Sequence, residues 1–490
     1  MRGYALRRST LYAAGLLTVV AGTATSHAAV SISSKPTKNI TCTSGVCSPT
    51  AKDAVLNVGD LTSMLATSGV KVTTGSGTLA RRVRNIDVSA GFSWASASAL
   101  TLDAYDSVTF SKPVSVAGTG AVVLKTNDGG NGGELSFGNK AGLSFLSPAN
   151  SLTINGSAYT LASSIAALAA DVAGNPSGHF ALSASYNAKP DGAYGAAPVA
   201  TTFDGTFNGL GNTISHMSIR ARAKGLNLGL FADIDPAGMI SSIRVTDAGI
   251  KAGQNSYAGV IAGMNYGTIS NSAAGGSITA AAGKGEGVEG GLVGLNEGTL
   301  SETAASTNVE VGGKSPFANA YVGGLAGQNI GTIETSYATG TATASGGIGF
   351  AVSGGLAGFN DGVIENSYAT GAESIGARWS VGGLVGDNGL TIASSYSLGA
   401  PTSKGGTVGG SVGLDVYDGE FLSNIYWDTT TSGITNLGQG AGNIANDPGI
   451  TGETTAQLQA GLPAGFDPTI WAESPSINGG LPYLIANPPQ

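Results

Sequence analysis

Two glutamates, Glu334 and Glu365, are the residues of this chain whose type and spacing come nearest to a catalytic pair. They lie 31 residues apart in two nearly identical phrases, GGLAGQNIGTIETSYATG and GGLAGFNDGVIENSYATG, and each directly follows an isoleucine. If each phrase forms one turn of a stack, the two backbones lie about 5 Å apart. Carboxylates at that spacing could be the acid/base pair of a retaining glycosidase or half of a calcium site. The simpler interpretation is that the two glutamates lie side by side on an open, solvated face without a function, because the interaction between exposed charges is weak and easily screened.

An enzyme built on this pair would also need a basic residue near the carboxylates. Between residues 256 and 430 no two cations share a position of the repeated phrase; these cations are Lys284, Lys314, Arg378 and Lys404. His179 and His216 have no partnering nucleophile, so neither a Ser-His-Asp triad nor a zinc site is indicated. We therefore predict no catalytic, cofactor-binding or metal-binding residue and no cofactor. A polysaccharide-active lyase or hydrolase is the alternative.

The two phrases belong to a longer array of repeats. Aligning the copies places one asparagine in the same position five times, at separations of 31, 33, 31 and 28 residues: Asn265, Asn296, Asn329, Asn360 and Asn388. Looser copies flank these five, and Asp415 takes the asparagine position in the last of them. About seven units exceed the three or so that a repeat array needs to bury a continuous core. No unit has room for a ten-residue helix, so we expect each to form one coil of a parallel β-solenoid.

Stacked coils would place equivalent residues above one another in columns. One column is aliphatic, and each burial in it would contribute about 1.5 to 3 kcal/mol; its members are Ile269, Leu300, Ile333, Ile364 and Ile392. The asparagines form a second column at a corner, where Asn tolerates left-handed backbone and amides can hydrogen-bond from coil to coil. A third column is aromatic and consists of Tyr337, Tyr368, Tyr396 and Tyr426.

Other segments surround this array. Residues 29–58 are polar and weakly patterned, whereas alternating apolar and polar residues over 59–158 predict half-buried strands. Leu161, Ile165, Leu168 and Val172 recur at helical spacing, which predicts one short amphipathic helix within a connector, residues 159–199.

The array itself spans residues 200–430, and residues 431–490 are expected to cap it. We expect Trp427 and Trp471 to close its C-terminal end, where the last coil would otherwise expose an apolar core. Stacking of these rings on carbohydrate is the functional alternative.

Composition restricts the function further. Glycine supplies 79 of 490 residues, about 16%, against a typical usage of roughly 7%, which fits a chain with many tight bends. Charged residues make up only 11% and the formal net charge is −8. The electrostatic footprint of a nucleic-acid-binding protein is therefore missing.

The N-terminus indicates export. Arg2, Arg7 and Arg8 precede the apolar run LYAAGLLTVVAGTA. Ser26 and Ala28 then provide small residues at the two positions that a signal peptidase recognises. We therefore predict a signal peptide over residues 1–28. No later stretch is apolar and long enough to predict a membrane span in the mature chain. Cys42 and Cys47 are expected to form a small local disulfide in an oxidising compartment.

The repeated phrase GGLxGxNxGxIxNSYATG resembles the GLUG motif of bacterial filamentous-haemagglutinin-like exoproteins. Residues 116–161 are similar to the haemagglutinin-type segment that commonly precedes such repeats, and FDGTFNGLGNTISHMSI at 203–219 is similar to their usual first coil. YWDTTTSG, TTAQLQAG and INGGLPYL resemble their C-terminal ending. The resemblance covers roughly residues 55–485.

This resemblance implies an all-β fold, a right-handed parallel β-helix, exported by a Gram-negative cell. It also implies an adhesin-like exoprotein that binds glycan or protein on host cells or extracellular matrix without catalysis. Such a protein would be secreted, held at the cell surface or periplasmic, with an outer-membrane transporter as a partner for secretion. A structural protein of a biofilm matrix and the polysaccharide-active enzyme named above are the alternatives.

Overall fold

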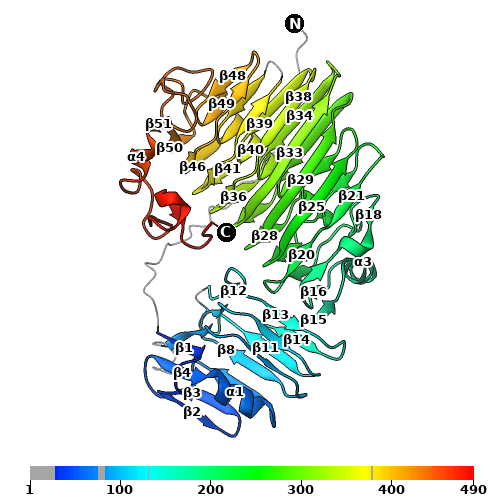
Figure 1. Cartoon of the computed structure of the whole chain (residues 1–490), viewed down its shortest axis with the longest axis vertical. Coiled ribbons are helices and arrows are strands. Elements are labelled where there is room, and N and C mark those ends of the chain that lie inside the picture. The colour runs from blue at the N-terminus through cyan, green and yellow to red at the C-terminus, as the bar shows by residue number, and fades with distance from the viewer. Residues whose placement is uncertain (1–27, 76–82, 131, 377–378, 490) are drawn as a thin grey trace.

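Alternating apolar and polar residues wind the chain into two stacks of parallel β-coils, because a coil buries its apolar residues best against the coils on either side. The computed structural model describes residues 28–75, 83–130, 132–376 and 379–489. In Figure 1 the first stack, coloured blue to cyan, lies below the second, coloured green to orange. Each stack has its own hydrophobic core. The parallel β-solenoid predicted from the sequence is confirmed.

The first solenoid consists of three-strand coils in which inward-facing apolar residues alternate with outward-facing polar ones. Equivalent strands of successive coils pair in parallel along its three sides. In chain order the strands of these coils are β6 (Val83–Val88), β7 (Phe92–Trp94), β8 (Leu100–Asp103), β9 (Val108–Phe110), β10 (Val114–Val116), β11 (Ala121–Lys125), β12 (Leu135–Phe137), β13 (Leu143–Phe145) and β14 (Ser151–Ile154).

Residues 29–58, weakly patterned in sequence, also belong to this solenoid. They supply most of β1 (Ala28–Ser33), β2 (Ile40–Thr43), β3 (Val46–Pro49), β4 (Ala54–Asn57) and the start of α1 (Val58–Leu65), which β5 (Val70–Thr73) follows. Val30 and Ile32 of β1 are fully buried between the neighbouring strands β4 and β6. Cys42 and Cys47 form the predicted disulfide across the β2–β3 hairpin. The predicted signal peptide, residues 1–28, lies outside the described residues apart from Ala28.

The predicted helix is shorter than its apolar spacing suggested and does more than connect. Leu161 lies in β15 (Ser157–Ala162), which turns back antiparallel to β14. Helix α3 (Ile165–Gly174) starts after Ser164, whose side chain accepts a hydrogen bond from the Ala167 N–H and caps the helix. Its buried residues, Ile165, Leu168 and Val172, pack into the core of the second solenoid. The helix therefore covers the beginning of that core.

The second solenoid has two seven-stranded parallel sheets and a third, longer face. One sheet contains β22 (Asn227–Leu228), β26 (Tyr257–Ala258), β30 (Gly285–Gly290), β34 (Ala318–Gly323), β39 (Phe350–Gly354), β44 (Ser380–Gly382) and β48 (Thr407–Gly409). The other contains β23 (Phe231–Ile234), β27 (Ala262–Asn265), β31 (Val293–Asn296), β35 (Ala326–Asn329), β40 (Ala357–Asn360), β45 (Val385–Asn388) and β49 (Val412–Asp415). Seven coils agree with the seven repeats in the sequence.

The third face continues from the first coils, which contain β16 (His179–Leu182), β19 (Thr206–Asn208), β20 (Thr213–Ser215), β21 (Ser218–Arg220), β24 (Met239–Ser241) and β25 (Arg244–Ala252). Later coils add β28 (Thr268–Ser270), β29 (Ala273–Ala281), β32 (Thr299–Ser301), β33 (Ala304–Gly313), β36 (Thr332–Glu334), β37 (Tyr337–Ala338) and β38 (Ala342–Gly346). The last coils add β41 (Val363–Glu365), β42 (Tyr368–Ala369), β43 (Glu373–Ile375), β46 (Thr391–Ser397), β47 (Thr402–Ser403) and β50 (Leu422–Asp428).

Glycine is abundant because the chain folds sharply back between the two seven-stranded sheets. At Gly323, which ends β34, an added Cβ would lie 1.9 Å from the carbonyl oxygen of Ala326. No side chain fits at that distance. Equivalent glycines, such as Gly354 and Gly382, end the same strand in neighbouring coils and have the same close approach.

The aliphatic column has the register predicted from the repeats. Ile269, Leu300, Ile333, Ile364 and Ile392 are paired from coil to coil and fully buried. The asparagine column is also confirmed and forms a continuous ladder. Each side-chain Nδ2 donates to the Oδ1 of the next asparagine at 2.7 to 2.8 Å, from Asn265 to Asn388.

The ladder ends on an acid. Asn388 Nδ2 donates to Asp415 Oδ1 at 3.1 Å, and Asp415 Oδ2 accepts the Gly419 N–H at 2.7 Å. A carboxylate only accepts hydrogen bonds, so it suits the end of a row that runs from donor to acceptor.

The prediction that ladder asparagines adopt left-handed backbone is wrong. The residues with positive φ, between 46° and 53°, lie two positions after the aliphatic column, at Asn271, Glu302, Thr335, Asn366, Ser394 and Asn424. The asparagines are required for their amides, whereas the sharp corner comes later in the coil and accepts several residue types.

The C-terminal region folds back along the side of the second solenoid. We call residues 455–489 the C-terminal strap; β51 (Ile450–Glu453) precedes it, and it contains α4 (Thr455–Leu458), β52 (Trp471–Ala472) and β53 (Tyr483–Leu484). Its apolar side chains cover the tyrosine column, in which three rings stack with centroids 4.9 and 5.0 Å apart. Tyr426 donates to the Ala464 carbonyl at 2.9 Å, and Asn487 reaches the Thr303 carbonyl at 3.0 Å. The strap thus spans several coils.

Replacing Asn329 with alanine tests the ladder. The change leaves a donor of Asn296 and an acceptor of Asn360 unsatisfied in the core, so the free energy of unfolding should fall by about 2 to 4 kcal/mol. Urea denaturation followed by circular dichroism measures this loss. Ile330→Ala, at the exposed neighbouring residue, is the control and should cost less than about 1 kcal/mol. Equal losses in both variants would contradict a stabilising ladder.

Candidate functional site

The structure brings Glu334 and Glu365 together as the sequence predicted. They are register partners on β36 and β41, and the column continues with Ser301 on one side and Ala393 on the other. Neither glutamate forms an ion pair in the described part of the chain. Over the same residues, no group of three or more His, Cys, Asp or Glu side chains is arranged to hold a metal ion. The pair lies on the surface without an ion-pair partner among the described residues.

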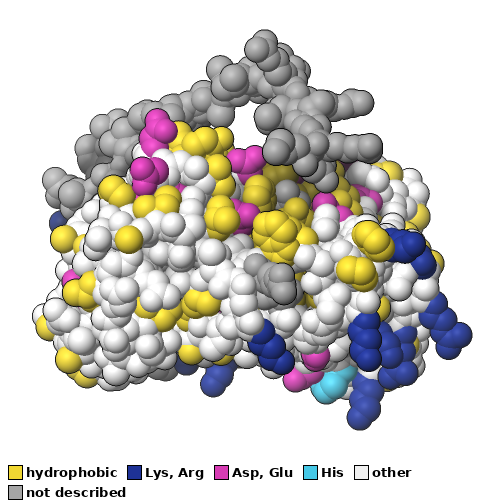
Figure 2. Space-filling model, turned by 90° about the horizontal axis from the view of Figure 1, so that it is seen from above, with side chains coloured by type: hydrophobic (Ala, Val, Ile, Leu, Met, Phe, Trp, Pro, Cys, Tyr) yellow, Lys and Arg dark blue, Asp and Glu magenta, His cyan; other side chains and the backbone are white. Residues whose placement is uncertain are grey.

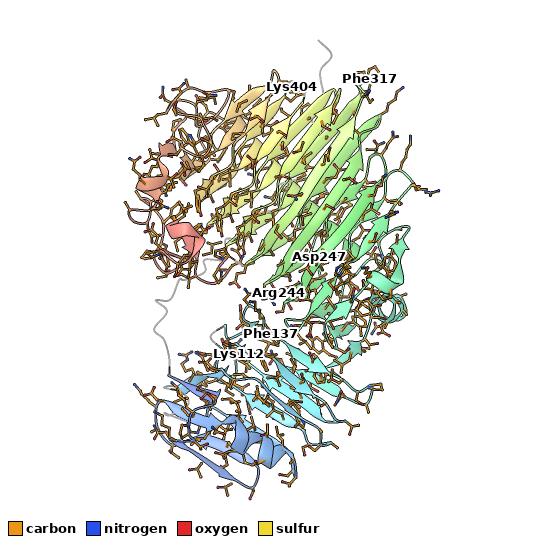
Figure 3. The ribbon with its side chains drawn as sticks, in the orientation of Figure 1. Lys112, Phe137, Arg244, Asp247, Phe317 and Lys404 are labelled. Carbon is orange, nitrogen blue, oxygen red and sulfur yellow. A yellow bond between two sulfur atoms is a disulfide. The ribbon has the colours of Figure 1, made fainter. Side chains whose placement is uncertain are left out.

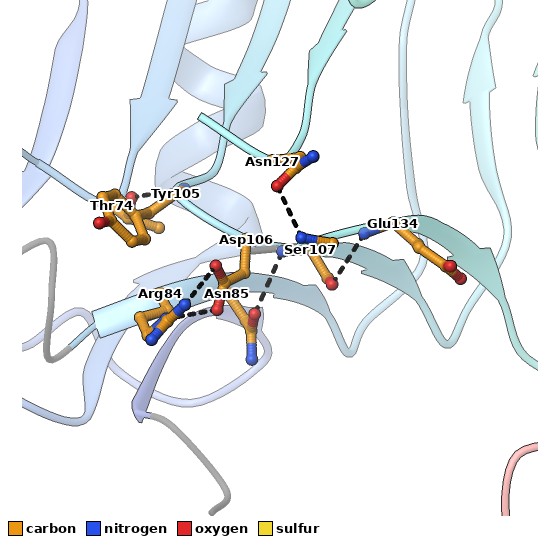
Figure 4. Close-up of polar contacts among 9 residues, drawn as sticks. Thr74, Arg84, Asn85, Tyr105, Asp106, Ser107, Asn127 and Glu134 are labelled. Atoms are coloured by element: carbon orange, nitrogen blue, oxygen red, sulfur yellow. Dashed lines mark hydrogen bonds and ion pairs between the residues drawn. The ribbon is translucent and has the colours of Figure 1, made fainter. Parts of the chain in front are cut away.

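A third glutamate, Glu302, occupies the left-handed corner of the coil before Glu334. Burial, followed by the charges of Glu134 and Glu334, raises the pKa of Glu302 to about 7. Glu134 belongs to the first solenoid, where its backbone N–H donates to Ser107 Oγ at 3.0 Å within the network drawn in Figure 4. The sequence could not indicate this meeting, because it depends on how the two solenoids lie together.

Four aromatic side chains of the second solenoid, of which Trp379 is exposed and the other three are half-buried, form a cluster that we call the aromatic ridge: Tyr321, Phe350, Phe359 and Trp379. Their ring centroids lie 5.6 Å apart for Tyr321 and Phe350, 5.7 Å for Tyr321 and Phe359, and 4.6 Å for Phe350 and Trp379. The rings come from three successive coils. Trp379 is 44% exposed, and its indole N–H donates to the Gly349 carbonyl at 2.7 Å, which fixes the ring.

Acidic groups border the aromatic ridge. Burial and the nearby Glu286 and Asp387 raise the pKa of Tyr321 to about 12, and burial, together with Asp415, raises the pKa of Asp387 to about 6. Phe317, which directly precedes β34 and is 70% exposed, has the Lys284 ammonium 5.7 Å from its ring centroid. Figure 2, which looks onto the upper end of the molecule, shows hydrophobic and acidic side chains in one band, with most Lys and Arg side chains at one side.

The tryptophans singled out from the sequence are not on this surface. Trp427 and Trp471 are both fully buried, so neither can stack on a carbohydrate. Trp471 packs against Tyr368 and Tyr396 at centroid distances of 6.1 and 5.8 Å, on the side of the solenoid. The prediction that Trp471 closes the last coil is therefore wrong.

The ridge residues escaped the sequence analysis for a physical reason. They point outward, in positions that are not repeated from coil to coil: Phe350 pairs with Asn319, and Phe359 pairs with Gln328. No periodicity marks such positions. The histidines offer no alternative centre, since His179 and His216 are exposed and lie in different coils of the second solenoid.

Two glutamates lie inside the second solenoid. Glu289 and Glu373 are each 1% exposed, and neither Oε atom of Glu373 has a hydrogen-bond partner among the described residues. Burial raises the pKa of both carboxyl groups well above the ordinary value. They face apolar neighbours such as Val322 and Ala342, so we regard them as neutral core residues and not as a site.

Comparisons with known proteins support the repeat and little beyond it. Residues 318–343 match the GLUG motif, and they form one coil from β34 to the start of β38. No curated protein matches the chain. One solved structure, described as a "putative immunoglobulin A1 protease from Bacteroides ovatus", is similar with 19% sequence identity and a TM-score of 0.39, over 63% of this chain and 85% of that chain. A likeness at that level carries no argument about function.

Ionisation of Glu373 should make stability depend on pH. Because the pKa is raised in the folded state, the stabilising contribution is complete below about pH 4.5 and is lost as the pH rises toward the folded value. Between pH 4.5 and pH 8 the unmodified protein should therefore lose about 1 to 3 kcal/mol more of its free energy of unfolding than the Glu373→Gln variant, whose side chain cannot ionise.

Urea denaturation at the two pH values provides the measurement. The exposed Glu365→Gln variant should follow the unmodified protein at both. If Glu373→Gln also followed it, Glu373 would have to be ionised or solvated in the folded state, contrary to its burial.

Proposed function

We propose that this protein is a non-catalytic, adhesin-like β-solenoid that binds glycan chains through its aromatic ridge. The observation that carries the proposal is the contact series from the half-buried Tyr321 and Phe350 to the exposed Trp379, at one edge of three successive coils. Rigid aromatic side chains supply contact area at low entropic cost, which is why they dominate binding surfaces.

Sugar chemistry fits this surface. The faces of sugar rings carry C–H bonds that pack on the electron-rich face of an aromatic ring, and their edges carry hydroxyls. Carboxylates such as Asp387 and Glu286, which border the ridge, can accept hydrogen bonds from those hydroxyls. Successive coils are about 4.8 Å apart, close to the length of one sugar unit in an extended chain. A glycan running along the stack could therefore contact one aromatic side chain after another.

The polysaccharide-active enzyme is the second candidate, and the in-register pair Glu334 and Glu365 is the observation in its favour. A retaining mechanism needs carboxyl groups about 5 to 5.5 Å apart, one of them with a raised pKa. The pair has the register for such a mechanism but lies apart from any described base or aromatic binding surface, so we favour binding over turnover.

Export completes the proposal. A protein of this kind would be secreted, held on the cell surface or retained in the periplasm, with host or matrix glycans and proteins as partners and an outer-membrane transporter as the route outward. Within the described ranges, no helix is long and apolar enough to cross a membrane. A gene for such a transporter beside the gene for this chain would support this route outward.

The first experiment measures binding of residues 29–490 to an array of glycans, matrix proteins and host-cell surfaces, and assays every glycan that binds for depolymerisation. We expect binding without turnover. Trp379→Ala and Phe350→Ala should each weaken glycan binding at least about tenfold, as expected for a rigid aromatic anchor.

Phe421→Ala is the matched control, because Phe421 is also an exposed aromatic residue but lies away from the ridge, next to Tyr417. The affinity of the Phe421→Ala variant for each glycan should equal that of the unmodified protein. Turnover that disappears in Glu334→Gln or Glu365→Gln would refute the non-catalytic role and favour the enzyme.

A further inference from the structure

A half-buried arginine without an ion-pair partner among the described residues lies where the two solenoids meet. Arg244 begins β25 of the second solenoid, and Figure 3 shows it facing the first solenoid near Phe137. Its Nη1 donates to the Gly211 carbonyl at 3.2 Å and its Nη2 to the Gly138 carbonyl at 3.3 Å. Gly138 directly follows β12, so the second of these hydrogen bonds joins the two solenoids.

These two carbonyl contacts do not satisfy the guanidinium. Its Nε is buried and has no hydrogen-bond partner. No carboxylate of the described chain forms an ion pair with Arg244; the ion pairs there are Lys71 with Asp103 and Arg84 with Asp106. Burial lowers the pKa of Arg244, but a guanidinium stays charged in proteins. A half-buried charge without a partner is costly, and a bound anion would remove that cost.

Space for an anion is present beside Arg244. A cavity of about 110 Å³ is lined by residues from three parts of the chain: Asn139 of the first solenoid, Arg244, Asn271 and Glu302 of the second, and Asn487 of the C-terminal strap. Water occupies about 30 Å³ in the liquid, so the cavity can hold a group larger than one water molecule. Its lining is mainly polar, and Arg244 is the one cation among the described residues that line it.

We propose that this junction cavity binds a carboxylate group, carried by a small organic acid or an acidic sugar, with Arg244 as its counter-ion. The carboxylate pairs with the guanidinium of Arg244, whose Nη groups each carry a second N–H besides the one given to a carbonyl, and the side-chain amides of Asn139 and Asn271 line the space for the rest of the molecule. This site is separate from the aromatic ridge and does not depend on the function proposed for it.

Glu302 should make this binding depend on pH. It lines the same cavity as Arg244, with Glu134 of the first solenoid and Glu334 of the next coil nearby, and its pKa is raised to about 7. Near pH 6 Glu302 is mostly neutral and tolerates an anion. Near pH 8 it is mostly charged and repels one, so affinity should fall at least about threefold between pH 6 and pH 8.

Isothermal titration of the full chain with glucuronate, acetate and glucose tests the proposal. We expect glucuronate to bind, glucose not to bind, and Arg244→Gln to weaken glucuronate at least about tenfold. Arg220→Gln, which removes an exposed arginine of the same solenoid, should leave the affinity unchanged. Binding of acetate as well would indicate a site for any small acid, whereas binding of glucuronate alone would indicate one for acidic sugars.

Glu302→Gln keeps the test decisive if Arg244→Gln fails to fold. This variant should bind glucuronate equally at pH 6 and pH 8. No binding of either acid at pH 6, unchanged affinity in Arg244→Gln, or a pH dependence that survives in Glu302→Gln would each overturn the proposal. Arg244 would then only hold the solenoids together.

Discussion

The hydrogen-bonded ladder of asparagine side chains is the interaction on which the second solenoid depends. Each amide from Asn296 to Asn388 donates to one neighbour and accepts from the other, so replacing any of them removes two hydrogen bonds in the core. The ladder fixes the register of the coils, and that register places isoleucine above isoleucine in the core and tyrosine above tyrosine outside it. Positions that remain free to vary lie on the outward faces and in the loops, and the proposed binding surface is built from these.

Columns inside the repeat could be predicted because a fixed spacing in sequence becomes a fixed position in space. The aliphatic, asparagine and tyrosine columns needed only that rule. The left-handed corner could not be located, because the residues that adopt it are chemically diverse and include Glu302 and Thr335. Leu161 was assigned to the helix because its spacing fits, although an antiparallel turn after β14 places it in a strand. Local pattern cannot reveal such a reversal of the chain.

The candidate sites also differ in how far the sequence could predict them. Glu334 and Glu365 lie in the repeat, and their neighbourhood was predictable, but their surroundings provide no chemistry. The aromatic ridge depends on positions that do not recur from coil to coil, and the Arg244 cavity depends on contacts between distant parts of the chain, such as Arg244 and Gly138, 106 residues apart. In a regular repeat fold, the features that distinguish one protein from another lie at positions of this kind. The two cannot substitute for one another, since the ridge offers a row of aromatic rings and the cavity a polar space beside the charge of Arg244.

The C-terminal strap changes how the second solenoid should respond to force. A simple solenoid touches only neighbouring coils, so tension at one end peels its coils off one at a time. Here the strap is attached at Tyr426 near the last coil and again at Thr303, several coils away. Tension on the C-terminal side must first separate the strap from the tyrosine rings beneath it, where Trp471 and Phe466 are packed. The last coils therefore stay in place until the apolar contacts between the strap and the tyrosine rings break together along the whole strap.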